Sequence, residues 1–352
     1  MFCMTKDKNH IPIANIYHML SYAYQSLQHD SYKAINTEPF EYVQDLFAAI
    51  LSIGIATQLK QGFRKEYIEM RGNLSTVRGK IAIWESAQLK MRGASRLSCC
   101  FDELSENHYM NRILKSTACC LINDSNVKRT NKDALKKAVW SFSGVDTLEP
   151  SAINWRVLHY NRGNAPYRML MAICYLVLHE LLLTTEDGKQ RLATFLDDQQ
   201  MSRLYEKFIL EYYKKHFPQY RPASKEIKWD AKGETEFLPS MQSDVLLTCA
   251  NRKLVIDAKY YGKIMQSHFG DATIRSTNLY QIFAYVKNED KTGTGLVDGM
   301  LLYAKTDMAA VPDVTYELNG SRISVKTLDL GQDFDGIRKA LNAIAEEWQR
   351  VV

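Results

Sequence analysis

The sequence predicts a mixed helical and β-sheet protein, of the α/β class in its second half and α+β overall. Two apolar runs, 245–247 and 254–256, have the length and β-branched content of buried strands, and Asn251-Arg252-Lys253 between them predicts a hairpin turn. Apolar residues at helical spacing precede this hairpin at 202–217, and a strand is expected after it at 299–303. This order of helix, hairpin, helix and strand is typical of a sheet covered by helices.

The first half of the chain predicts a helical base interrupted by a β-rich insertion. A helix is expected over 16–23 with Asn15 as its N-cap, followed by a long apolar helix over about 39–61. Strand-like alternation then appears at 64–70. We expect the insertion, at about 62–104, to project from the helices around it.

Helices resume after the insertion. They are expected over 102–121, 131–140, 165–183 and 334–352. Turn residues at 141–150 form the clearest internal break. We therefore expect an N-terminal helical domain at 1–159 and a second domain at 160–352.

Composition bounds the class of protein. With 352 residues, 46% of them hydrophobic and 24% charged, the chain has room for two globular domains. A net charge of +5 suits a phosphate-bearing partner, although many basic proteins bind no nucleic acid. The polar first ten residues predict no signal peptide, and seven cysteines without a CxxC spacing favour a reducing bacterial cytoplasm; no membrane segment is expected.

Carboxylates at the ends of the predicted hairpin indicate chemistry. Asp244 opens the first strand, Asp257 closes the second, and Lys259 lies two positions further on the same face. Carboxylates from adjacent strands can converge on a hard divalent cation, with the backbone carbonyl of Ala258 as a further ligand, and Lys259 can serve the water that attacks a phosphodiester. The alternative interpretation is an edge strand that ends in solvated charges.

The spacing D-(x)12-D-x-K, with Pro239 upstream, resembles the PD-(D/E)xK nuclease core. The resemblance implies a glutamate on the preceding helix, which here is Glu206, as an additional metal ligand. It also implies that Gln281 and Tyr285, which share one helical face, line the active-site groove. The alternative is a helix that packs on the sheet with Tyr285 in the core and Gln281 exposed.

A phosphate-binding loop is not expected. The segment 72–80 has two glycines and a lysine, but six residues separate Gly72 from Gly79, and Ile81 stands where a hydroxyl is required. We expect the chain to hydrolyse no nucleotide by itself.

Longer stretches of sequence resemble the McrC family. They include LYEKF, IKWDA, LPSMQSDV, LVIDAKYY and NLYQIFAYV in the second half, and IPIANIYHMLSYAY and FDELSENHYMNRILKST in the first. The resemblance covers the chain from Ile11 to about Gln349. It implies the nuclease subunit of a modification-dependent restriction system, with Mg2+ as the cofactor and double-stranded DNA carrying methylated cytosine as the substrate.

The resemblance also implies a partner, an McrB-like AAA+ GTPase hexamer that binds the GTP. A finger from the N-terminal domain would enter the ring and stimulate hydrolysis, and cleavage would follow translocation and the meeting of two complexes, with possible self-association through the nuclease domain. Arg71, Arg78 and Lys80 are the candidate contacts at the finger tip. The alternative for these cations is a solvated hairpin tip.

Two other functions are compatible with these residues. A stand-alone nuclease of DNA repair or recombination would need no nucleotide, and the neighbouring gene would then encode no AAA+ GTPase. A non-catalytic subunit could keep the nuclease fold and only activate its partner, but the presence of Asp244, Asp257 and Lys259 together argues against this interpretation.

Overall fold

The computed structural model describes residues 11–161, 164–186, 198–260, 265–268, 271–305 and 312–350. Two compact units make up the chain: a sheet unit, Met1–Leu46 with Leu183–Val352, and a helical unit, Phe47–Leu182. These bounds differ from the expected domain boundary at 159/160 in two ways: the helical unit continues to Leu182, and the segment that ends at Leu46 belongs to the same unit as the carboxy-terminal half. The sheet unit is therefore discontinuous in sequence.

Helices and strands alternate in groups along the chain. The α-helices are α1 Ile13–Ala23, α2 Val43–Gln61, α3 Ile83–Met91, α4 Tyr109–Asn123, α5 Arg129–Trp140, α6 Ala165–Glu186, α7 Asp198–His216, α8 Ser276–Glu289 and α9 Phe334–Arg350. The strands are β1 Glu66–Leu74, β2 Lys80–Ile81, β3 Leu97–Ser105, β4 Glu226–Ile227, β5 Met241–Gln242, β6 Val245–Cys249, β7 Arg252–Tyr260, β8 Met265–His268, β9 Asp271–Ile274, β10 Val297–Lys305, β11 Val314–Leu318 and β12 Ser321–Asp329. Short 3-10 helices include Gln25–Gln28 and Asp30–Thr37. The mixed class predicted from the sequence is confirmed.

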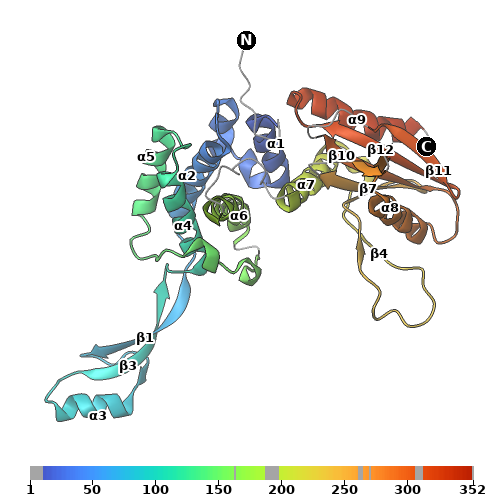
Figure 1. Cartoon of the computed structure of the whole chain (residues 1–352). Coiled ribbons are helices and arrows are strands. Elements are labelled where there is room, and N and C mark those ends of the chain that lie inside the picture. Colours follow the sequence, from blue (N-terminus) through green and yellow to red (C-terminus); the bar gives the residue numbers. More distant parts are fainter. Residues whose placement is uncertain are drawn as a thin grey trace. The chain divides into compact units, whose positions relative to one another are not determined.

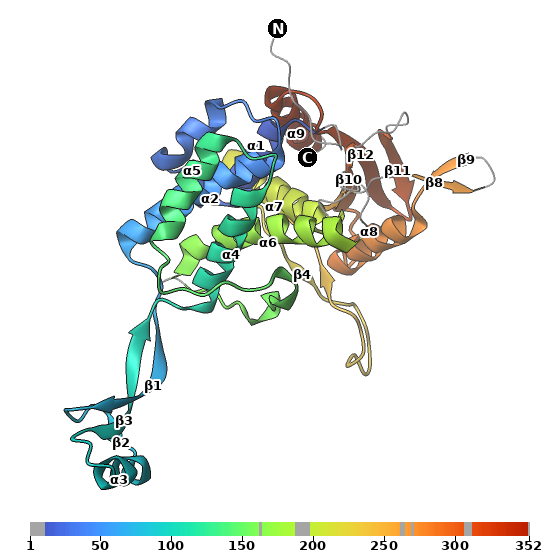
Figure 2. The ribbon, with the colours of Figure 1, turned by 60° about the vertical axis from the view of Figure 1, so that its left-hand side comes forward.

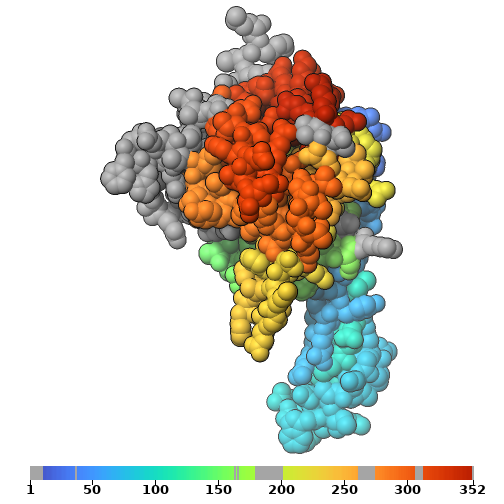
Figure 3. All heavy atoms as spheres, turned by 90° about the vertical axis from the view of Figure 1, so that its right-hand side faces the viewer, coloured from blue at the N-terminus to red at the C-terminus, as the bar shows by residue number. Residues whose placement is uncertain are grey.

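A three-stranded antiparallel sheet with one helix extends from the helical unit. Its strand order is β1-β3-β2, with α3 packed against β3, and Figures 1 and 2 show it leading away from α4 and α5. We call this segment, 66–105, the projection. It largely coincides with the insertion expected at about 62–104, and its atoms are drawn in cyan in the space-filling view of Figure 3.

The two ends of the projection are joined by one buried side chain. The Asn111 amide donates hydrogen bonds to the carbonyl oxygens of Arg64 and Glu106, both at 2.8 Å. Its own oxygen accepts one from the Tyr167 hydroxyl at 2.7 Å. Asn111, fully buried in α4, thus ties the residues just before β1 and just after β3 to the helices beneath.

The sheet unit is built on a five-stranded sheet in the order β11-β12-β10-β7-β6. Its three central strands are parallel, while β6 and β11 run antiparallel to their neighbours. Helix α7 packs on β7 and α9 on β12, whereas α8 contacts β7, β10 and β12 from the opposite face. Helices therefore cover both faces, which agrees with the apolar sequences of β7 and β10.

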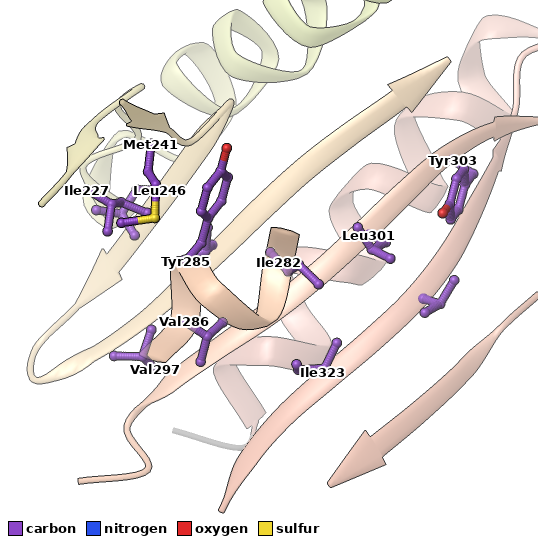
Figure 4. Packing of buried hydrophobic residues seen from close by; sticks show 12 residues of the cluster. Ile227, Met241, Leu246, Ile282, Tyr285, Val286, Val297, Leu301, Tyr303 and Ile323 are labelled. Carbon is purple, nitrogen blue, oxygen red and sulfur yellow. The ribbon is translucent and has the colours of Figure 1, made fainter. Parts of the chain in front are cut away.

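The core between α8 and the sheet is close-packed (Figure 4). Ile282 and Val286 of α8 face Leu301 and other apolar residues of the strands. A Cβ atom built on Gly299 would lie 2.8 Å from Val286 Cγ2 and 2.9 Å from Ile282 Cγ1. Position 299 therefore has room for glycine alone, and this close approach holds α8 against β10.

The amino-terminal helix is an integral part of the sheet unit. Helix α1 packs on α7, and buried Asn15 donates hydrogen bonds to the carbonyl oxygens of Leu330 at 2.9 Å and Gln332 at 2.7 Å. The prediction that Asn15 caps the first helix is wrong, because α1 begins at Ile13 and the cap position is Pro12.

Other boundaries also differ from the predictions. The hairpin turn is Ala250-Asn251, with Ala250 at a φ of 49°, so that Arg252 and Lys253 belong to β7. The segment 102–105 extends β3 instead of starting a helix, and α3 was not expected. Among the described residues, no helix is both long and apolar enough to cross a membrane. The six cysteines of that part of the chain are free thiols, and Cys3 lies outside it.

Candidate active site

The hairpin β6–β7 brings the two predicted aspartates face to face. Val245 is paired with Ile256 in the antiparallel register, and one further step sets Asp244 opposite Asp257. The Asp244 carboxylate accepts a hydrogen bond from the backbone N–H of Ala258 at 2.7 Å, between its Oδ2 and the amide nitrogen. The Asp244 side chain thus accepts the backbone hydrogen bond of Ala258 at a point before β6 begins at Val245. Since the N–H and C=O of one strand residue point to the same side, the Ala258 carbonyl also points toward Asp244.

Lys259 lies beside Asp257 on the face of the sheet that α8 covers. Its Nζ is 2.9 Å from Asp257 Oδ2 and 3.0 Å from Gln281 Oε1, to which it donates a hydrogen bond. Gln281 Nε2 in turn donates to the Tyr285 hydroxyl at 2.7 Å. Tyr285 is buried in the core, and its hydroxyl ends this chain of contacts.

Glu206 of α7 approaches the two aspartates from the other helix layer. Its carboxylate accepts a hydrogen bond from the Ser202 hydroxyl at 2.8 Å, one helical turn earlier. The charge of Glu206 contributes to raising the pKa of both Asp244 and Asp257, which places its carboxylate within electrostatic reach of each. The structure therefore gathers all six predicted site residues around one end of the hairpin.

Burial sets the electrostatics of the pair. It raises the pKa of Asp244 well above its usual value, and the neighbouring charges of Asp257 and Glu206 add to the increase. Burial also raises the pKa of Asp257, which is 1% exposed, although the Lys259 ammonium opposes the shift. A divalent cation would relieve the repulsion and would compete with protons for the same oxygens, so cation binding here should strengthen as the pH rises.

The oxygen donors of the site determine which cation it can hold. Within the described residues, no group of three or more His, Cys, Asp or Glu side chains stands ready to hold a metal ion by itself. The available set is the Asp244 and Asp257 carboxylates and the Ala258 carbonyl. Asp257 Oδ2 is buried and contacts the Lys259 ammonium at 2.9 Å. Two carboxylates and a carbonyl fit Mg2+, which retains several water ligands and needs no complete protein cage.

The three cations predicted for the projection do not form one cluster. Arg71 and Lys80 both lie beside Cys100 of β3, on strands at its two sides, so their side chains share one face of the small sheet. The Arg78 guanidinium instead lies 4.2 Å from the centre of the Phe101 ring, on the opposite face. All three side chains are exposed.

Some residues of potential importance were not identified from the sequence. Helix α3 exposes Ile83, Trp84 and Met91, a set of large apolar side chains at the end of the projection. In the sequence, the only sign of this surface is a short apolar group within a segment otherwise rich in charge. Exposed apolar side chains of this kind are typical of a surface that contacts another protein. Ser202, which holds Glu206, gave no signal beyond its place one turn earlier on the helix.

The fold and the site define a mixed α/β protein with a buried carboxylate pair suited to a divalent cation. The chain belongs to the family described as "McrBC 5-methylcytosine restriction system component", whose profile matches residues 4–304.

Known proteins are similar over most of the chain. The Escherichia coli (strain K12) protein described as "Type IV methyl-directed restriction enzyme EcoKMcrBC" is 26% identical over 343 residues, which cover 96% of this chain and 98% of that protein. A solved half-complex from a tetradecameric assembly of Thermococcus gammatolerans McrB AAA+ hexamers with bound McrC contains a chain that is 17% identical with a TM-score of 0.49, covering 95% of this chain and 76% of that one. A cryo-EM structure of the Thermococcus gammatolerans McrBC complex gives 19% identity and a TM-score of 0.41, with 57% of each chain covered.

Proposed function

We propose that this chain is the McrC-like nuclease subunit of a modification-dependent restriction complex and hydrolyses DNA phosphodiesters with Mg2+. The observation that carries the proposal is the geometry of the hairpin, which sets Asp244 opposite buried Asp257, with Lys259 Nζ at 2.9 Å from the second carboxylate. This geometry supports assignment of the site to the PD-(D/E)xK class. Membership in a restriction-system family supports DNA as the substrate.

Each residue of the site has a separate task in this proposal. Asp244, Asp257 and the Ala258 carbonyl hold the cation, and Glu206 adds negative charge from α7. When bound, Mg2+ supplies a Lewis acid that neutralises phosphate charge and lowers the pKa of water. Lys259 positions the attacking water and stabilises negative charge that develops on the phosphate, while Gln281 keeps the ammonium in place through its hydrogen bond at 3.0 Å.

The partner in this proposal is an McrB-like AAA+ GTPase hexamer. The family is described as a 5-methylcytosine restriction system component, which supports methylated DNA as the target of the complex. We assign GTP hydrolysis to the partner chain, because segment 72–80 of this chain does not fit the phosphate-loop pattern, and we assign recognition of methylated cytosine to the partner as well. The projection docks on the hexamer. Its root is fixed by Asn111, and its end carries exposed cations on both faces of the sheet together with the apolar side chains of α3.

The cleavage test uses the full-length chain with an McrB-like partner, GTP, Mg2+ and methylated duplex DNA. Asp257→Ala and Lys259→Ala should each abolish cleavage, because the metal ligands and the lysine act as a unit. Stimulation of the partner's GTPase should persist. Cleavage by Asp257→Ala at the wild-type rate would refute the site. Wild-type cleavage without the partner would favour a stand-alone nuclease, and GTPase stimulation without any wild-type cleavage would favour a non-catalytic activator.

The docking test compares two charge-matched double variants. Arg78→Ala with Lys80→Ala, in the projection, should reduce GTPase stimulation, and cleavage should fall with it. Lys60→Ala with Lys291→Ala removes the same charge from two exposed lysines outside the projection and should stimulate the GTPase like the wild type. Exposed charges contribute little to stability, so both variants should fold. Equal stimulation by the first variant and the wild type would exclude Arg78 and Lys80 as contacts.

A further inference from the structure

Helix α5 carries a basic stripe that plays no part in the site or in the projection. Arg129, Lys132, Lys136 and Trp140 recur at intervals of three and four residues, and Lys137 lies next to them on the helix surface. At 100° per residue, these five side chains fall within one side of the helix. We call this set the α5 stripe.

The stripe makes little contribution to packing. The opposite side of α5 carries buried Leu135 and Ala138, and the helix packs on α4 at the outside of the helical unit (Figure 1). Arg129, Lys136 and Lys137 are exposed. Trp140, at the carboxy-terminal end of the stripe, is 85% exposed, although indole is a side chain that folding ordinarily covers.

Charge on the stripe is only slightly neutralised from within. Asp133 lies 3.9 Å from Arg129 Nε and 3.7 Å from Lys136 Nζ, and these exposed pairs are long and weak. Four cations against one carboxylate leave the surface strongly positive. Such a surface matches a polyanion, and the exposed indole supplies a flat apolar group that can pack on a sugar or a base.

We propose that the α5 stripe binds the phosphate backbone of DNA without regard to base sequence. From Arg129 to Trp140 it extends about 16 Å along the helix axis, or roughly five base pairs of duplex. Phosphate contacts position DNA but do not read bases, so this surface holds DNA that is specified elsewhere. The inference deepens the proposed function, in that the surface would retain the DNA on which the nuclease site acts, but its test measures binding alone.

The test is fluorescence anisotropy of a labelled, unmethylated 30-base-pair duplex with the full-length chain in EDTA, at several NaCl concentrations. The variant Lys132→Ala, Lys136→Ala and Lys137→Ala should weaken binding about tenfold or more. It should also reduce the slope of log affinity against log salt by about 2.7. Trp140→Ala should weaken binding and leave that slope unchanged.

The matched control is Lys60→Ala, Lys291→Ala and Lys339→Ala, which removes the same charge from three other exposed lysines. Its affinity and salt slope should stay close to those of the wild type. Equal losses in the two triple variants would overturn the proposal, because overall charge alone would then explain the binding. Unchanged DNA binding by the stripe variant would also overturn it, and in that case weaker binding to the AAA+ partner would identify the stripe as a protein contact.

Discussion

The contact between Gln281 and Lys259 allows a graded prediction of cleavage rates. Gln281→Met keeps the length of the side chain and removes its hydrogen bond to an ammonium whose side chain is only 15% exposed. A hydrogen bond to a charged group contributes about 1.5–3 kcal/mol, which corresponds to a rate loss of roughly 10- to 150-fold if the bond holds Lys259 in its working position. Tyr285→Phe removes a bond between neutral groups, worth about 0.5–1.5 kcal/mol, and should cost roughly 2- to 12-fold.

The assay is single-turnover cleavage of methylated DNA with partner, GTP and Mg2+ at saturation. A positioning role predicts a lower cleavage rate with unchanged affinity for DNA. The melting temperature should fall by no more than the few degrees expected for loss of one hydrogen bond, so that the protein stays folded at the assay temperature. Tyr280→Phe is the control, since Tyr280 is the exposed neighbour of Gln281 on α8, and it should cleave at the wild-type rate.

Two results would refute the reasoning. If Gln281→Met cleaves like the wild type, the amide does not position the ammonium during the reaction. If Tyr285→Phe loses more activity than Gln281→Met, the tyrosine acts by another route than through Gln281.

Three further predictions concern stability. Asp244→Asn should be more stable than the wild type at pH 8 in EDTA. The pKa of Asp244 is raised in the folded state, so the wild type loses stability as the pH rises from the pKa of the unfolded chain through that of the folded one. The advantage of the variant should shrink toward pH 4, and a constant difference in chemical denaturation across that range would contradict the reasoning. Asn15→Ala should lower the free energy of unfolding of the sheet unit by about 2–4 kcal/mol, because the buried Leu330 carbonyl and the partly buried Gln332 carbonyl both lose their donor. An unchanged urea midpoint would contradict this, and exposed Asn73→Ala serves as the control. Gly299→Val should destabilise the same unit by about 1–3 kcal/mol or more, as its methyl groups overlap α8, and a thermal midpoint equal to that of the wild type would exclude the close approach.

The hairpin and its charged residues could be predicted because their pattern is local. Alternation along a strand fixes which side chains share a face, so Asp257 and Lys259 were expected together from sequence alone. The turn was expected at 251–253 and lies at 250–251, because the left-handed position is filled by Ala250, whereas Asn or Gly is the usual signal for that conformation.

Other features could not be predicted because they depend on contacts between residues that are far apart in the sequence. Asn15 is of a residue type that often caps helices, but its side-chain amide donates a hydrogen bond to the carbonyl oxygen of Leu330, 315 positions away in the sequence. Helix α3 has nine residues with Ile83 and Trp84 exposed, so its apolar residues do not follow the spacing of a buried face. The separation of Arg78 from Arg71 and Lys80 likewise follows from the register of three strands, which the sequence does not specify.

The discontinuity of the sheet unit determines the order in which the protein can be completed during synthesis. Helix α1 leaves the ribosome early, but its hydrogen-bonding partner at Leu330 follows 315 residues later, or roughly 15 to 60 s at ordinary rates of translation. Phe47–Leu182 is continuous and can fold in that interval, while the apolar side of α1 waits uncovered. A chain that terminates early can therefore present a finished projection and no assembled active site, which would make such fragments competitors of the intact subunit for any partner that the projection binds.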